Sequence, residues 1–298
     1  MKNTCDLHIH TTYSDGTMSP IELLQLVEKR NLKKLSITDH DCVDFYFNQE
    51  AMDFISKEKI EYIVGCEFSC IFKNIPIEIL GYGLDIHKTK KYLEKHGLTV
   101  KRLEKYRSKK IPKVFKKHGI TLDYNESSMV DFSLERPDAV LEIFKSVLRN
   151  KAAVKLLKTE NESLIKNQSL FMRKGVHNPD SKIFVNMRDF YPTAKKILKK
   201  IRKFGGICFL AHPYQYGSQM LKILEGLKND LDGVECYHHS SQEQEKITFL
   251  SNFCHKNNLM ISGGSDFHFN THGNEKSHLN EFNIPEKYFD LIKHKLEK

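Results

Sequence analysis

The chain of 298 residues lacks the features that would assign it to a membrane or secreted class. No window approaches 18 consecutive apolar residues, so no membrane-spanning helix is expected. The opening segment MKNTCDLHIH contains no apolar core of a secretion signal. Internal repeats and low-complexity linkers are also missing, and nothing in the sequence indicates an obligate protein partner. These absences favour a cytoplasmic protein that does not bind a membrane.

The spacing of the cysteines does not match that of a disulfide framework or a zinc site. The seven cysteines are an odd number and include no C-x-x-C pair, so neither a disulfide framework nor a thiolate zinc site is expected. Most of them lie among apolar neighbours, which indicates buried thiols in a reducing compartment. Histidine is plentiful by contrast. The 15 histidines are more than a structural role usually needs.

The basic charge is confined to the middle of the chain. The whole sequence has a net charge of +9, but residues 86–180 contain 22 basic and 11 acidic residues, a net +11, which leaves −2 for the remainder. Such a segment can bind phosphate groups. It can equally form a lysine-rich solvated surface, and the sequence leaves both interpretations open.

Runs of β-type residues alternate with amphipathic helical patterns. The helix predicted at 19–31 begins with a capping box of Ser19 and Glu22, with Pro20 at its first position. Strand–helix alternation predicts a (β/α) barrel with its site at the carboxyl rim of the strands. The short Lys73–Asn74 turn predicts a hairpin, so the barrel is expected to be distorted. The seven predicted strands span 5–10, 33–40, 61–69, 75–83, 205–213, 231–239 and 259–268.

Residues 86–185 contain few β-type runs and are predicted to be mostly helical. Two long helices are predicted, at 92–119 and 136–158. We therefore expect an α/β fold in which 1–85 and 186–298 form a distorted (β/α)7 barrel and 86–185 form a helical insertion. The length of the chain suits one large α/β barrel or two modest domains.

The stretch DLHIHTTYSDGT indicates a metal site. In a strand, Asp6, His8 and His10 share one face, while Leu7 and Ile9 share the other. One His-x-His is a weak motif, but most of the predicted strands end in histidine or a carboxylate, and a barrel brings its strand ends together. Imidazole and carboxylate ligands suit Zn²⁺, Mn²⁺ or Fe²⁺. Eight or nine ligands are too many for one ion and suit two or three.

Five motifs resemble those of the PHP (polymerase and histidinol phosphatase) domain family. They are DLHIHTTYSDG, LSITDHD, GCEFS, LAHP and GGSDFH, and they occur in the family's order. The resemblance covers about 1–85 and 185–298. In the basic segment, LERPDAV is similar to the family's arginine–proline element. The most similar subgroup is the stand-alone phosphoesterases that act on nucleotides or short RNA.

The resemblance implies a distorted seven-stranded barrel with a trinuclear metal site. Position by position, the first metal would have His8, His10, Glu67 and Asp266 as ligands. The second would share Glu67 and bind His212, and the third would bind Asp15, His40 and His268. The family usually has histidine where this chain has Glu78. Glu78 is expected either to bind the second metal or to mark a weakly occupied position.

Other residues are candidates for substrate binding and proton transfer. His212, His238 or a metal-bound water would protonate the leaving group, and Asp39 would orient His40 or cap its turn. Arg136 is the candidate for a second phosphate, unless it makes a salt bridge at a helix start. Arg173, Lys174 and His177 are weaker candidates, and Tyr13 and Tyr214 could stack on a base.

The predicted activity is hydrolysis of a phosphate ester by a hydroxide that bridges two or three ions of Mn, Fe or Zn. The expected substrate is a nucleoside 3′,5′-bisphosphate, another small nucleotide or a short oligonucleotide. Three alternatives remain open from the sequence: a histidinol phosphatase, a metal-dependent amidohydrolase, and a non-catalytic module that binds metal or nucleic acid.

Overall fold

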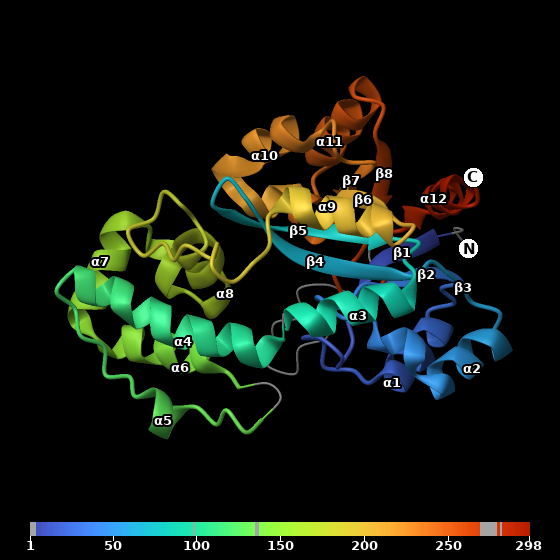
Figure 1. Cartoon of the computed structure of the whole chain (residues 1–298). Coiled ribbons are helices and arrows are strands. Elements are labelled where there is room, and N and C mark those ends of the chain that lie inside the picture. The colour runs from blue at the N-terminus through green and yellow to red at the C-terminus, as the bar shows by residue number, and fades with distance from the viewer. Residues whose placement is uncertain (1–3, 98, 135–136, 269–278, 281) are drawn as a thin grey trace. The chain divides into compact units, whose positions relative to one another are not determined.

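The computed structural model of the protein describes residues 4–97, 99–134, 137–268, 279–280 and 282–298 (Figure 1). The chain divides into two compact units. The first comprises Met1–Cys70, Ile77–His96 and Thr193–Lys298, and the second comprises Ile71–Pro76 and Gly97–Pro192. These bounds differ from the predicted limits of the barrel and the insertion, and that division into domains stays a prediction.

The strands pair in two sheets. One has the order β3 (Glu61–Tyr62), β2 (Lys34–Ile37), β1 (Thr4–Ile9) and β9 (Ile284–Pro285). The other has the order β4 (Gly65–Phe72), β5 (Ile75–Tyr82), β6 (Ile207–Leu210), β7 (Gly233–Tyr237) and β8 (Met260–Gly263). Strand β1 pairs parallel to β2 and antiparallel to β9, while β6, β7 and β8 run parallel to one another.

The two sheets meet at two single parallel bridges. Ile9 pairs with Phe267, just beyond β8, and His40, just beyond β2, pairs with Glu67 in β4. The predicted α/β fold is confirmed, but a closed seven-stranded barrel is not, because the described strands pair as two open sheets. Register shifts interrupt regular pairing between Asp6 and Ile9, and again along β7. Such irregularities re-aim side chains next to functional sites.

Helices of the first unit pack on the outer faces of its sheets (Figure 1). α9 packs against β6, α11 against β7 and β8, and α12 against β1 and β9. Leu7, Leu80, Tyr82, Phe209 and Phe289 are fully buried in the core between strands and helices. Among the described residues, the α-helices of this unit are α1 (Pro20–Lys29), α2 (Gln49–Lys57), α3 (Ile86–His96), α9 (Ala194–Lys203), α10 (Met220–Leu227), α11 (Gln244–Lys256) and α12 (Lys287–Leu296).

Several local predictions are confirmed by the structure. The backbone N–H of Ser19 donates to the Glu22 carboxylate at 2.8 Å, and the Ser19 hydroxyl accepts from the backbone N–H of Glu22, which completes the capping box. Lys73 and Asn74 have φ of 47° and 75°, so they form a two-residue turn of the primed type that joins β4 to β5. All seven cysteines are free. The predicted strand at 61–69 is two strands, β3 and β4, and the short β9 was not predicted.

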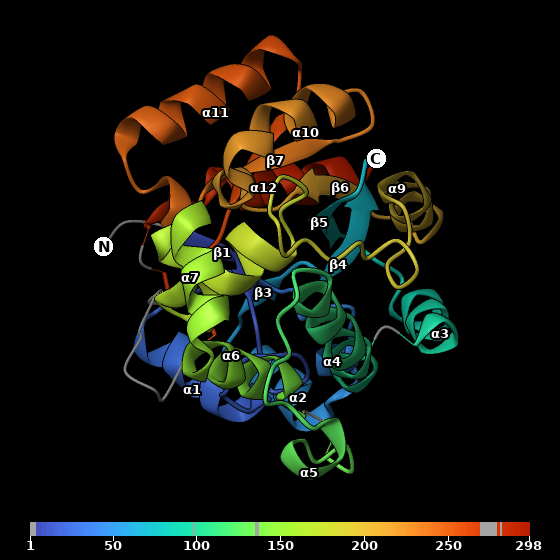
Figure 2. The same cartoon turned by 90° about the vertical axis from the view of Figure 1, so that its left-hand side faces the viewer.

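The second unit is helical and has its own core (Figure 2). α4 (Val100–Lys117) packs along α6 (Ala139–Arg149), which is followed directly by α7 (Lys151–Glu160). Phe115, Ile143, Val147 and Phe171 are fully buried in this core or nearly so. Two shorter helices, α5 (Glu126–Met129) and α8 (Gln168–Leu170), complete its α-helices in the described part of the chain.

Both long helices predicted from the sequence are interrupted. The first ends as α3 at His96, because Gly97 has a φ of 55°, and α4 begins after its cap residue Thr99. The second is divided at Asn150, whose side chain caps α7 by accepting from the backbone N–H of Ala153 at 3.0 Å. Periodicity alone does not reveal breaks of one to three residues. No helix among the described residues is both long and apolar enough to cross a membrane.

Candidate metal centre

Histidines and carboxylates from the strand ends of both sheets gather around Glu67, in β4. Glu67 is fully buried. One of its oxygens, Oε2, lies 3.0 Å from Nε2 of His8 and 3.3 Å from Nδ1 of His40. The other, Oε1, lies 2.9 Å from Nε2 of His212. One carboxylate therefore contacts ring nitrogens from three different strand ends, as a ligand shared between two ions would.

We call the whole set the histidine–carboxylate cluster. Ligand atoms within 4.8 Å of one another define its first group, His8, His10, Glu67 and Asp266. A second group is His10, Asp15, His40 and His268, and a third is His40, Glu67 and Glu78. His212 joins the third group, since its Nε2 lies 3.2 Å from Glu78. The cluster comprises His8, His10, Asp15, His40, Glu67, Glu78, His212, Asp266 and His268.

The donors of this cluster fit divalent metal ions. Nε2 of His10 is buried and makes no hydrogen bond, although Asp266 lies 3.1 Å away and Glu67 lies 3.3 Å away. A buried nitrogen that converges on two carboxylates without hydrogen-bond geometry is placed as a metal ligand would be. The other ring nitrogen of His10 lies 3.3 Å from the Ser14 hydroxyl, which orients the ring. Mixed imidazole and carboxylate donors suit Zn²⁺, Mn²⁺ and Fe²⁺.

Glu78 points into the site. Its side chain is about one-third exposed, and its carboxylate contacts His212 at 3.2 Å and approaches His40 to 4.0 Å. The backbone N–H of Glu78 donates to the Tyr216 hydroxyl at 3.0 Å. Of the two expectations for this position, the geometry agrees with a side chain that can contribute a ligand.

Glu235 contacts two residues of the cluster and was not predicted to belong to the site. It lies in β7, is fully buried, and accepts a hydrogen bond from Nδ1 of His8 at 2.9 Å. Its other oxygen accepts from the backbone N–H of His212 at 2.7 Å. A carboxylate that holds one nitrogen of a histidine leaves the opposite nitrogen free for a metal. The available signal was a charged residue inside the apolar run GVECY, which needs a buried partner.

Asp39 caps the turn that follows β1. It accepts from the backbone N–H and the hydroxyl of Thr11, both at 2.7 Å, and also from the Ser14 hydroxyl. Asp6 likewise accepts from the backbone N–H of Ser265 at 2.9 Å, which ties β1 to the segment that carries Asp266. These two carboxylates fix the loops after β1 and β8.

The cluster has strong internal electrostatics. Burial alone would lower the pKa of His40, but the Glu67 and Asp15 carboxylates raise it to about 9. Burial alone would also lower the pKa of His268, but the Asp15 and Asp266 carboxylates raise it to about 10. Burial would raise the pKa of Glu67, yet the imidazolium charges of His8 and His40 hold it well below its usual range. Without metal, the site is therefore a network of imidazolium–carboxylate pairs.

Two residues of the cluster have a backbone conformation that is rare for side chains other than glycine. His212 has a φ of 30° and Asp266 a φ of 52°. Such strain persists only where surrounding contacts fix it, and it is concentrated at functional sites. The contacts that fix these two segments are the Glu235 bond to His212 and the hydrogen bond from the Asp266 backbone N–H to the His8 carbonyl at 2.9 Å.

His238 is buried beside the cluster. Its Nδ1 accepts the backbone N–H of Ser240 at 3.0 Å, so its Nε2 carries the proton and donates to Asp266 at 3.2 Å. Burial lowers the pKa of His238. The ring is therefore neutral at neutral pH and supports Asp266.

The roles of the remaining predicted substrate residues stay predictions. Arg136 lies outside the described residues. Arg173 and His177 belong to the second unit, where burial and Arg107 lower the pKa of His177 to about 3. In the first unit, the Tyr13 hydroxyl accepts from the Asn48 amide at 3.2 Å, and the Tyr214 ring lies under Lys246, 5.4 Å from its ammonium nitrogen.

The chain matches the PHP domain model over residues 6–295. It belongs to the PHP domain family. The family predicted from the five motifs is therefore confirmed, and the match also extends across the helical segment between them.

Curated relatives and solved structures agree with this assignment. The chain is 26% identical over 278 residues to the 5′-3′ exoribonuclease of Haemophilus influenzae, covering 90% of this chain and 91% of that protein. It is 32% identical over 80 residues to the 3′,5′-nucleoside bisphosphate phosphatase of Chromobacterium violaceum, covering 27% of each. A candidate metal-dependent phosphoesterase from Bifidobacterium adolescentis has the same fold, with a TM-score of 0.64, 18% identity, and coverage of 97% of this chain and 94% of that one.

Proposed function

We propose that this protein is a metal-dependent phosphoesterase that hydrolyses the ester at the 3′ oxygen of a nucleotide. The substrate would be the 5′-terminal nucleotide of a short RNA or a nucleoside 3′,5′-bisphosphate. The observation that carries this proposal is the histidine–carboxylate cluster around Glu67. Two relatives support the substrate class, because one is named for RNA hydrolysis from the 5′ end and the other for nucleoside bisphosphates. One bond cleavage, at the 3′ oxygen, accounts for both.

Two or three ions of Mn, Fe or Zn would occupy the cluster. His8, His10, Glu67 and Asp266 would hold the first, and Glu67, Glu78 and His212 the second. Asp15, His40 and His268 would hold the third. When bound, such ions neutralise phosphate charge and supply a water that ionises near neutral pH. We also propose that the two sheets act as one distorted barrel of the PHP type. The bridges at Ile9 and His40 join the edges of the two sheets.

The protein's own contribution is to hold the donors in place. Glu235 fixes the His8 ring so that its Nε2 faces Glu67, and Ser14 orients the ring of His10. Because these partners are buried and hydrogen-bonded, the ligands need little rearrangement when ions bind.

We assign His238 to positioning. Its Nε2–H donates to Asp266, which fixes one carboxylate oxygen while the other faces His10. A neutral histidine that is already donating to a carboxylate is a poor acid for the leaving group. We therefore assign the proton for the leaving 3′ oxygen to water rather than to His238. His212 would be engaged instead as a ligand of the second ion, since its Nε2 faces Glu67 and Glu78.

One experiment tests the function. Protein prepared without chelators is assayed for metal content and then for hydrolysis of a nucleoside 3′,5′-bisphosphate, a short 5′-phosphorylated RNA, histidinol phosphate and an N-acyl amino acid. We expect two to three ions per chain and release of 5′-mononucleotides from the first two substrates. Preference for histidinol phosphate, or hydrolysis of the amide alone, would select one of the other enzyme classes. Full metal content without hydrolysis would indicate a binding module.

A further inference from the structure

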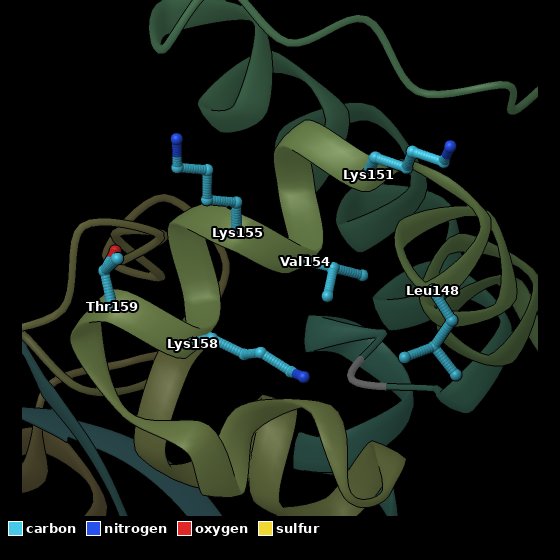
Figure 3. Close-up of a pocket in the computed structure, with 6 residues that line it drawn as sticks. All are labelled: Leu148, Lys151, Val154, Lys155, Lys158 and Thr159. Carbon is cyan, nitrogen blue, oxygen red and sulfur yellow. The ribbon is translucent and has the colours of Figure 1, made fainter.

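The second unit has a basic surface hollow that the proposed chemistry does not use. Its volume is about 480 Å³, and it lies on α7 and the end of α6. Figure 3 shows Lys158 extending across the hollow toward Leu148, with Val154 between them, while Lys151 and Lys155 extend outward from α7. The residues that line it are Leu148, Lys151, Val154, Lys155, Lys158 and Thr159.

Three lysines of this hollow follow one face of α7. Lys151, Lys155 and Lys158 are separated by four and three residues, which are the spacings that place side chains on the same side of a helix. At a rise of 1.5 Å per residue, their Cα atoms are spread over about 10 Å along the axis. We call Lys151, Lys155, Lys158 and the apolar floor of Leu148 and Val154 the α7 lysine face.

The charges of this face are not balanced locally. In the described part of the chain, none of its three ammonium groups makes an ion pair, whereas Lys145 on α6 pairs with Glu142 at 2.7 Å. Glu160 at the end of α7 accepts from the backbone N–H of Lys182 at 3.0 Å. The first turn of α7 contains no acidic residue and begins with Lys151. A cation there is unfavourable for the helix, because helix N-termini carry partial positive charge. The arrangement lowers helix stability and raises the positive potential at the hollow.

The apolar side chains of Leu148 and Val154 limit which classes of ligand can bind the α7 lysine face. Leu148 is 43% exposed and lines the hollow together with the three lysines. A nucleic acid strand offers both complements, since its phosphates match ammonium groups and its sugars and base faces match apolar side chains. The second unit as a whole contains 21 basic and 11 acidic residues, which would attract such a polyanion from a distance.

We propose that the α7 lysine face binds the backbone of a single-stranded RNA that the protein takes as substrate. This rests on the proposed function for its choice of RNA. The three ammonium groups contact successive phosphates, and Leu148 and Val154 contact sugars or bases. A strand held there stays associated after each terminal nucleotide is released.

The chain offers a matched control for this face. Lys109, Lys113 and Lys116 on α4 have the same four-and-three spacing, are exposed, and belong to the same unit, but they do not line the hollow. Replacing either set by alanine removes the same charge from the same unit. Alanine is also the best helix former, so both variants should fold.

The test measures binding and hydrolysis separately. Fluorescence anisotropy with a nuclease-resistant, phosphorothioate 12-nucleotide RNA is compared for the full chain, the K151A/K155A/K158A variant and the K109A/K113A/K116A control. We expect the α7 variant to bind at least about 10-fold more weakly. Its slope of log affinity against log salt should fall by about 2, because each single-strand phosphate contact contributes about 0.7. The ratio of kcat/KM for a hydrolysable 12-mer to that for a nucleoside bisphosphate should fall in parallel.

Three outcomes would overturn the assignment. Unchanged RNA binding by the α7 variant would remove the site, and equal losses in both variants would reduce it to a general charge effect. Equally tight, lysine-dependent binding of poly-glutamate would make it a surface for any polyanion. If the full chain bound the RNA through these lysines but hydrolysed no phosphate ester, the function proposed for the metal centre would fail while the RNA surface remained.

Discussion

The two units of the chain present their charged groups in opposite ways. The first has almost no net charge, with 26 basic and 27 acidic residues, yet it buries a histidine–carboxylate cluster in which His8 and Glu67 have no solvent exposure. The second has a net charge of +10 and presents unpaired lysines on α7 to solvent. Buried polar groups must find partners, so the fold determines where they lie. Surface charges are free of that constraint, so the fold alone does not explain their pattern.

The largest expected effect lies in the buried cluster. His10→Ala or Asp266→Ala removes a donor from the group of His8, His10, Glu67 and Asp266. Because bound ions supply several kcal/mol of stabilisation to a phosphoryl transition state, each change should lower kcat/KM for a phosphate ester by about 10³-fold or more. Steady-state kinetics and metal content measure the effect. The control is His255→Ala on the exposed side of α11, and hydrolysis close to wild type in both cluster variants would show that the reaction occurs elsewhere.

The next effect concerns the residue that the sequence did not reveal. Glu235→Gln keeps the shape of the side chain but can no longer hold the His8 Nδ1–H with a charged acceptor. Loss of such an outer partner should weaken metal affinity by about 10- to 100-fold. Competition with a chelating dye measures it, and Glu245→Gln on exposed α11 is the control. Unchanged affinity would mean that Glu235 only supports the fold.

Sequence patterns predicted the cluster better than its supports, and the reason is physical. Each ligand strand ends in a short motif, and the ends of neighbouring strands converge, so His8, His40, Glu67 and His212 could be placed together. Glu235 has only one weak local signal, a charged residue inside an apolar run, because its role depends on two partners that are distant in sequence. The division of the strands into two sheets could not be predicted either, because the single bridges between the sheets depend on contacts between residues that are distant in sequence. In the helical unit, periodicity found the helices but not the breaks at Gly97 and Asn150.

Metal binding should release protons. In the metal-free protein, the carboxylates raise the pKa of His40 to about 9 and that of His268 to about 10, so both rings are protonated at neutral pH. A metal accepts only the neutral ring, so affinity should increase with pH until about pH 9–10, by roughly tenfold per unit for each proton displaced. The lowered pKa of Glu67 keeps it ionised, so it releases no proton.

Calorimetry measures this release. Metal is titrated into the metal-free protein in two buffers of different ionisation enthalpy. The difference between the two measured heats gives the number of protons displaced at each pH. His268→Gln should reduce that number by about one near pH 8. A pH-independent affinity between pH 6 and 9 would contradict the network of imidazolium–carboxylate pairs.

A smaller change is expected when Glu78, which stands where the family usually has histidine, is replaced. Glu78→His replaces a carboxylate that contacts His212 at 3.2 Å with a softer imidazole donor. Preference should shift severalfold from Mn²⁺ toward Zn²⁺, because softer ligands favour Zn²⁺. Competition between the two metals, read by elemental analysis, measures the shift. An unchanged ratio would remove Glu78 from the ligand set and leave the second ion with fewer donors.

The smallest effect returns to α7, where stability and binding should oppose each other. Lys151 begins the helix immediately after its cap residue Asn150, so its charge faces the positive end of the helix dipole. Lys151→Glu should therefore stabilise α7 by about 0.5–1 kcal/mol and slow hydrogen exchange of its amides, while it weakens RNA binding. The matched change Lys109→Glu lies in the interior of α4, where the dipole contributes little. It should slow exchange there only by what the new pairs with Lys105 and Lys113 contribute, about 0.2–0.5 kcal/mol each. If Lys151→Glu stabilised the helix without any loss of RNA affinity, the lysine would be ordinary solvated surface. A loss of both stability and binding would show instead that α7 itself depends on this side chain.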